Sequence, residues 1–101
     1  MERLTFTYPA RETVARRVHV GVVGSGDLEV LLEPSADSDA HVDVTTSVDG
    51  FGTVWQHVLD RFFSRFDGAA AIEINDFGAT PGVVALRLAE AIEAADEGAS
   101  S

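Results

Sequence analysis

The chain has 101 residues, of which 46% are hydrophobic and 24% are charged, and its formal net charge at pH 7 is −10. This acidic balance argues against binding to a nucleic-acid backbone, which needs clustered Lys and Arg. The sequence has no cysteine, which excludes disulfides and thiolate metal sites, so any thioester chemistry would need a thiol from outside the polypeptide.

Four strands are predicted in the first half of the chain. Apolar and polar residues alternate over residues 3–8, 14–23, 28–33 and 41–47, with the period of two that half-buried strands show. The second and third of these segments are joined by a short glycine-containing stretch, which is typical of a β-hairpin. The sequence therefore predicts a hairpin within a sheet.

The tip of this hairpin is Gly24-Ser25-Gly26. Two glycines tolerate a positive φ, and they leave the Ser25 hydroxyl open to the active site of another protein. The same tripeptide is also ordinary turn chemistry, so a plain turn is the alternative to a functional serine. Asp27 then either bonds to backbone amides of the turn or steers Ser25 into a modifying enzyme.

A first helix is predicted after these strands, with Ser47 or Asp49 as its N-cap. The residues that support it are apolar and recur at helical spacing, which indicates a continuous buried face. This stripe is interpreted as core rather than as a ligand site, and its members are Phe51, Val54, Trp55, Val58, Leu59, Phe62, Phe63 and Phe66.

A strand over residues 71–76 and a second helix complete the predicted elements. Thr80 and Pro81 supply an N-cap and a first helical residue, and the helix is expected to end at about Ala95. Its inward face holds Val84, Leu88, Ala91, Ile92 and Ala95, whereas Arg87, Glu90 and Glu93 are expected to point outward.

Strands followed by helix, strand and helix predict an α+β fold. We expect a two-layer sandwich in which two α-helices cover one face of an antiparallel or mixed β-sheet. Residues 1–96 are expected to form a single domain and 97–101 a disordered C-terminal tail. No segment has the length and apolarity of a membrane span, and a cytoplasmic protein is expected.

Two patterns that suggest metal sites are set aside. Asp37, Asp39, His41 and Asp43 alternate as calcium ligands can, yet the glycine and glutamate that such a loop requires are absent from the register. We interpret the segment as a solvated loop that leads into a strand. Residues 76–78 read Asp-Phe-Gly, as in the magnesium motif of kinases, but the chain is too short for a kinase. No metal site is predicted.

A serine hydrolase is also disfavoured. His19 lies six residues before Ser25 on the same predicted strand, which places it roughly 20 Å away. His57 belongs to the polar side of the first helix, and the elbow in which a nucleophilic serine precedes a helix is missing. No catalytic residue is therefore predicted.

Three segments of the chain resemble the acyl carrier (delta) subunit of malonate decarboxylase in the same order. They are residues 22–34 (VVGSGDLEVLLEP), 46–52 (TSVDGFG) and 72–82 (IEINDFGATPG), and the resemblance extends over nearly the whole chain. A more distant resemblance is to the acyl carrier (gamma) subunit of citrate lyase. The resemblance to the malonate decarboxylase subunit implies that Asp76-Phe77-Gly78 is a structural loop, in which Gly78 supplies a turn conformation.

The resemblance implies a non-catalytic carrier, and no direct membrane insertion. Ser25 would carry 2′-(5″-triphosphoribosyl)-3′-dephospho-coenzyme A through a phosphodiester, with Gly24, Gly26 and Asp27 flanking and presenting it. The partners implied are the transferase subunit, the decarboxylase subunit and a prosthetic-group transferase, and the cargo is an acetyl or malonyl thioester. The alternatives are an unmodified regulatory or assembly module that docks through the 24–27 hairpin tip and, third, a serine-dependent acyl-transfer enzyme.

Overall fold

The computed structural model describes residues 2–13, 17–21, 27–47 and 49–100. Within this part of the chain the elements follow one another in the order β1 (Glu2–Pro9), β2 (Glu12–Thr13), β3 (Val18–Gly21), β4 (Leu28–Pro34), β5 (Asp39–Thr46), α1 (Gly52–Phe63), β6 (Gly68–Asp76) and α2 (Pro81–Ser100). Strands and helices thus alternate in the second half, as the sequence predicts.

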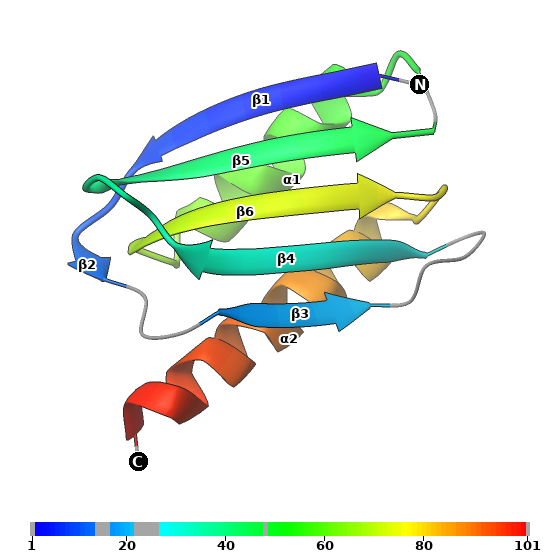
Figure 1. Cartoon of the computed structure of the whole chain (residues 1–101). Coiled ribbons are helices and arrows are strands. Elements are labelled where there is room, and N and C mark those ends of the chain that lie inside the picture. Colours follow the sequence, from blue (N-terminus) through cyan, green and yellow to red (C-terminus); the bar gives the residue numbers. More distant parts are fainter. Residues whose placement is uncertain (1, 14–16, 22–26, 48, 101) are drawn as a thin grey trace.

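The strands form a mixed sheet in the order β1-β5-β6-β4-β3, with the short β2 paired to the start of β6 (Figure 1). β6 lies in the centre, parallel to β5 and antiparallel to β4. The outer strands β1 and β3 are antiparallel to β5 and β4, respectively. The predicted α+β fold with a mixed sheet is confirmed.

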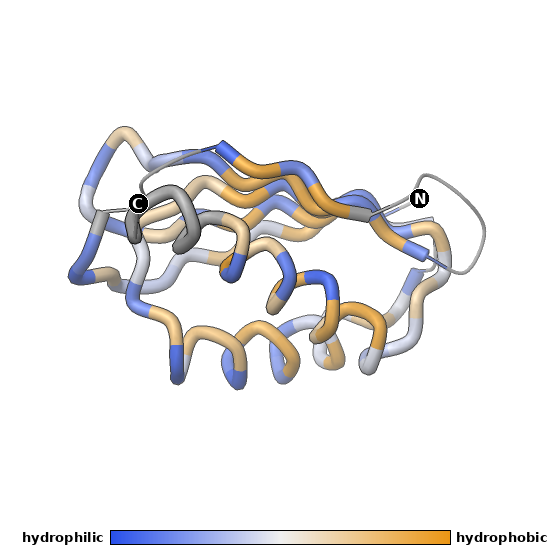
Figure 2. Tube along the Cα trace, turned by 90° about the horizontal axis from the view of Figure 1, so that it is seen from below, coloured by the Kyte–Doolittle hydropathy of each residue, from blue (hydrophilic) through white to orange (hydrophobic). Residues whose placement is uncertain are grey.

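Both helices lie on the same side of the sheet (Figure 2). α2 packs across β3 and β4, whereas α1 contacts β1 and α2. Alternate residues of the central strands point to this side because successive side chains of a strand face opposite ways. The buried core from strands and helices comprises Val18, Leu28, Val30, Leu32, Val42, Val44, Trp55, Leu59, Ala70, Ile72, Ile74, Val84, Leu88 and Ala91.

Of the strand predicted over residues 14–23, β3 covers residues 18–21 and Arg17 lies outside it, while residues 14–16, 22 and 23 are outside the described residues. The chain first forms β2, which runs parallel to β6, and only then the hairpin strand β3. The cause lies before β2, where the backbone N–H groups of Arg11 and Glu12 both donate to the carbonyl of Asp67, at 2.8 and 3.1 Å. These bonds hold the chain against the start of β6 before it can join β4.

The predicted first helix is also too long and too buried. α1 ends at Phe63, where the Ser64 hydroxyl donates to the Arg61 carbonyl at 2.6 Å. Trp55 and Leu59 are core residues, but Phe51 is 48% exposed and Val54 is 40% exposed. Phe51 is itself the N-cap and makes no side-chain capping bond, so neither Ser47 nor Asp49 caps the helix.

The second helix begins as predicted and continues further. The Val83 backbone N–H donates to the Thr80 hydroxyl at 3.3 Å, and Pro81 is the first helical residue. The helix runs to Ser100 rather than to the predicted end at about Ala95. Ala, Glu and Asp follow Ala95 and are compatible with helix, and one glycine is tolerated there at modest cost. In the described residues, no helix is long and apolar enough to span a bilayer.

Candidate functional site

Gly24, Ser25 and Gly26 lie within residues 22–26, outside the described residues. The strands on both sides of this segment are described and form the predicted hairpin. Gly21 ends β3 and pairs with Glu29 of β4, so Ser25 is midway in sequence between two paired residues. In sequence, the segment follows β3 and precedes β4, which are the last two strands at one edge of the sheet (Figure 1).

Asp27 is the one predicted site residue that the structure describes, and its carboxylate is bound within the molecule. Arg87 of α2 donates from Nε to Oδ1 at 3.1 Å and from Nη2 to Oδ2 at 2.9 Å. The Leu28 backbone N–H donates to Oδ1 at 2.7 Å. The hydrogen bonds from the Arg87 guanidinium hold the pKa of Asp27 below its ordinary value, and the bond from the Leu28 N–H is the second largest cause. The carboxylate is thus ionised at neutral pH and engaged on both oxygens.

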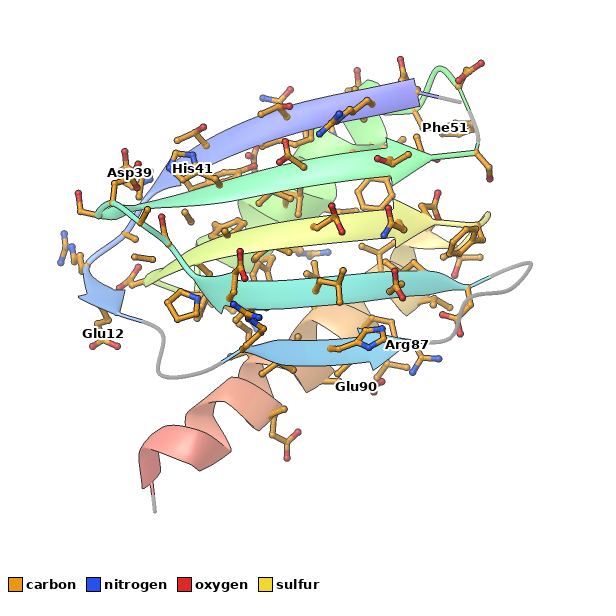
Figure 3. All side chains as sticks on the ribbon, in the orientation of Figure 1. Glu12, Asp39, His41, Phe51, Arg87 and Glu90 are labelled. Carbon is orange, nitrogen blue, oxygen red and sulfur yellow. The ribbon has the colours of Figure 1, made fainter. Side chains whose placement is uncertain are left out.

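Arg87 is the residue that the sequence reasoning missed. Its side chain is 24% exposed rather than pointing outward, and its Nη1 donates to Glu90 one turn later at 3.0 Å. In Figure 3, Arg87 lies with Glu90 on α2, at the side of the molecule where β3 ends. Asp27 and Arg87 are 60 positions apart, and opposite charges at that separation give no local signal. The only hint was that α2 contains a single basic residue.

The backbone of Asp27 is also fixed to the loop between β6 and α2. The Phe77 N–H donates to the Asp27 carbonyl at 2.9 Å. This loop begins at Asp76, whose carboxylate is 5% exposed and accepts from the Thr46 hydroxyl at 2.8 Å and the Ala79 N–H at 2.8 Å. Gly78 has a φ of 98°, which confirms the expected turn conformation. The Asp-Phe-Gly segment is structural.

A second set of side-chain contacts is made by Glu29, which pairs with Gly21 at the end of β3. Glu29 accepts from Asn75 of β6 at 2.9 Å and is 2.9 Å from Nε2 of His19 on β3. It therefore connects the last three strands of the sheet near their ends. His19 is held on β3 by its contact with this carboxylate.

Two hollows of the described surface differ in their distance from the hairpin end. An apolar cavity of about 320 Å³ lies beside the β6–α2 loop, and its lining includes Thr46, Trp55 and Asp76. Its acidic group, Asp76, is already bonded to Thr46. A groove of about 1210 Å³ between the helices holds His57, Arg61 and Arg65 but is bordered by Gly68. Gly68 begins β6 and Leu28 pairs with its last residue, roughly 25 Å along a strand of that length.

These positions bear on the kind of site that the hairpin end forms. At the hairpin end, His19 and the carboxylates of Glu29, Asp27 and Asp76 are engaged in bonds within the molecule, whereas His57 lines the groove near the other end of the sheet. The described residues contain no cluster of three or more His, Cys, Asp or Glu side chains that could hold a metal.

Comparison with known proteins gives the family. The family model for the malonate decarboxylase delta subunit matches residues 15–95. A malonate decarboxylase acyl carrier protein of Pseudomonas paraeruginosa is 54% identical over 96 residues, covering 94% of this chain and 97% of the relative. The corresponding protein of Azotobacter vinelandii is 49% identical over 94 residues and covers 92% and 95%.

A solved structure shows the same fold. A chain in the crystal structure of a Pseudomonas malonate decarboxylase hetero-tetramer in complex with malonate superposes with a TM-score of 0.89. It is 49% identical in sequence, and the match covers 93% of this chain and 98% of the other.

The fold and these relatives define an acyl carrier protein, a carrier rather than a catalytic subunit. The class implies a covalently attached prosthetic group. More narrowly, the chain belongs to the malonate decarboxylase delta subunit family.

Proposed function

We propose that this chain serves malonate decarboxylase as its acyl carrier and that Ser25 is the attachment point of its prosthetic group. The carrier role rests on the family match over residues 15–95. The choice of Ser25 is supported by the hairpin, because the paired residues Gly21 and Glu29 flank this segment in sequence. A cytoplasmic location stays a prediction.

The group proposed is a dephospho-coenzyme-A-type nucleotide, 2′-(5″-triphosphoribosyl)-3′-dephospho-coenzyme A, linked by a phosphodiester to the Ser25 hydroxyl. When bound, it supplies the thiol that carries acetyl or malonyl as a thioester. The chain itself has no cysteine, which agrees with a thiol from outside the polypeptide. The described residues fit an exposed group, since the cavity beside the β6–α2 loop is lined mostly by apolar side chains, which do not suit a charged nucleotide.

The chain's own residues then act by presentation. Gly24 and Gly26 leave room for the modifying enzyme around the Ser25 hydroxyl. A carrier that serves two active sites works through a tethered arm, because tethering gives each site a high effective concentration of the acyl group. The partners proposed are the transferase subunit, the decarboxylase subunit and the prosthetic-group transferase. The related hetero-tetramer is named malonate decarboxylase.

Intact mass spectrometry tests the attachment. Wild type incubated with the prosthetic-group transferase and its nucleotide donor is expected to gain one adduct, which peptide mapping places on Ser25. Ser25→Ala should gain none and keep its stability within about 0.5 kcal/mol, as for other surface changes. Ser38→Ala, an exposed serine elsewhere, should load like wild type. An unmodified wild type would favour the assembly module that docks through residues 24–27.

The two glycines give a second test of the same site. Gly24→Val and Gly26→Val are expected to slow loading more than they lower stability, because β-branched residues resist positive φ and add bulk beside the hydroxyl. Loading rates measured by the same adduct should fall for both variants. Equal rates for wild type and both variants would remove the steric argument.

A further inference from the structure

We propose that Arg87 is a positioning residue for modification at Ser25, and that it acts through Asp27. This inference rests on the proposed function, because it takes Ser25 as the attachment site. It assigns a role to a residue of α2 that lies 60 positions from Asp27. Arg87 is not a catalytic residue in this proposal, because its proposed effect on Ser25 is transmitted through Asp27.

The first step is the place of Asp27. It is separated from Ser25 by Gly26 alone, and it is the first described residue after the segment. Its side chain is fixed by Arg87 on both oxygens, and its carbonyl accepts from the Phe77 N–H at 2.9 Å. Every degree of freedom fixed at Asp27 limits the directions in which the chain can leave toward Ser25.

The second step is that Arg87 is well suited to fix an orientation. Three of its nitrogens are used: Nε and Nη2 bind Asp27, and Nη1 binds Glu90 at 3.0 Å. A planar guanidinium that binds a carboxylate through two parallel bonds sets the angle as well as the distance. Its neighbour Leu88 is fully buried, so the helix that carries Arg87 is anchored to the sheet.

The third step separates positioning from stability by a comparison within the same hairpin. Its opposite end also has an ion pair, Arg17 with Glu33, at 3.2 Å. There the side chains are 81% and 50% exposed and one nitrogen makes the contact, whereas Asp27 and Arg87 are 21% and 24% exposed. Exposed single contacts contribute little. Arg17 is therefore the matched control for Arg87.

The experiment measures loading kinetics with the prosthetic-group transferase and its dephospho-coenzyme-A-type donor, with the full-length carrier as the varied substrate. If only a fraction of an untethered segment has the competent orientation, the apparent KM rises by the inverse of that fraction. Arg87→Gln is expected to raise KM for the carrier about tenfold with kcat little changed. Arg87→Lys keeps the charge without the two-point contact and should raise KM about threefold. Arg17→Gln should match wild type.

A second measurement does not depend on loading. Amide hydrogen exchange of the unmodified carrier should speed up at residues 26–28 in Arg87→Gln and remain at the wild-type rate in Arg17→Gln. It is recorded well below the unfolding midpoint of each variant, so that a general loss of stability is distinguishable from a local change. The double variant Asp27→Arg with Arg87→Asp restores a pair of opposite charges and should recover part of the lost KM.

The outcomes separate the two proposals. A wild type that takes no adduct overturns the proposed function and this inference with it. A wild type that loads at Ser25, with KM and local exchange unchanged in Arg87→Gln, overturns this inference alone. A loading defect that follows only the folded fraction of each variant, including Arg17→Gln, also overturns it, because it would show a structural role.

Discussion

The two loops that lead from the sheet into the helices start at the same end of the strands, because Thr46 and Asp76 end the adjacent paired strands β5 and β6. Each contains a glycine with positive φ, Gly50 at 87° and Gly78 at 98°. They differ in their bonding. In the loop before α2, the buried Asp76 carboxylate accepts from the Ala79 N–H, and Thr80 caps the helix that follows. At the start of α1, by contrast, the N-cap residue Phe51 makes no side-chain capping bond.

This difference concerns function because the β6–α2 loop bonds to the hairpin. Phe77 of the β6–α2 loop donates to Asp27, next to the proposed attachment segment. The loop before α1 instead contacts β1, where the Gly50 N–H donates to the exposed Glu2 carboxylate at 3.2 Å. The more strongly bonded loop is the one that supports the end of the hairpin.

The largest effect is expected from Asp76→Ala. The change leaves the Thr46 hydroxyl and the Gly78 and Ala79 N–H groups without the acceptor that they now share, at a cost of about 3 kcal/mol in the free energy of unfolding. Urea denaturation measures it. Glu73→Ala, an exposed change on the same strand, should cost less than about 0.5 kcal/mol. Equal costs would contradict the contrast between the loops.

Gly78→Ala should have the next largest effect. A φ of 98° is strained for any residue with a Cβ, and the expected loss is about 1 to 2 kcal/mol. Gly82→Ala is the control, because Gly82 lies in the first turn of α2 and an added Cβ would make only an ordinary contact with Thr80 Oγ1, at 3.9 Å. That change should be neutral or stabilise by about 0.5 kcal/mol. Thermal unfolding of both variants decides between these signs.

The helix caps give a smaller and opposite pair of changes. Thr80→Ala removes the bond to the Val83 N–H and should cost about 1 kcal/mol. Phe51→Asn adds a capping side chain where none bonds now and should gain no more than about 0.5 kcal/mol, because some apolar contact is lost. If Thr80→Ala and Phe51→Asn shift the unfolding midpoint in the same direction, the difference between the two helix starts is not due to capping.

The smallest effect is expected in the pH dependence of stability. The pKa of Asp27 is lowered in the folded state by Arg87 and by the Leu28 N–H. Its contribution to stability is therefore present above the ordinary aspartate pKa of about 3.9 and is lost as the pH falls through the lower folded value. Asp27→Asn should therefore lose less stability than wild type as the pH falls from 5 to 2, and the difference between the two should shrink in strong salt. An identical slope would show that Arg87 does not perturb this carboxyl.

Much of the sheet was predictable because alternation records which face of a strand is buried. Val30 and Leu32 of β4 and Val42 and Val44 of β5 are core residues, as their period of two indicates. Thr80 and Pro81 likewise marked the start of α2 by local chemistry. These features depend on neighbours in sequence, which a single chain displays directly.

The features that sequence reasoning missed depend on partners far away in the chain. β2 forms because Arg11 and Glu12 meet Asp67, and Arg87 turns inward because Asp27 lies beside it. The exposed Phe51 fits the helical period but lies at the N-cap, beyond the reach of the sheet. The attachment residue could be predicted only as a candidate, because the same Gly-Ser-Gly is ordinary turn chemistry.

The central place of β6 has a consequence for how the chain is made. β5 pairs with β1 and β6, and β4 pairs with β3 and β6. Until residues 68–76 leave the ribosome, the strands already synthesised can form only two separate antiparallel pairs, and an isolated pair of strands is marginally stable in water. β6 is the strand that joins them, and the contacts it makes are distant in sequence, which slows folding. Nascent chains that stop before Gly68 should therefore be recognised by chaperones and proteases as unfolded.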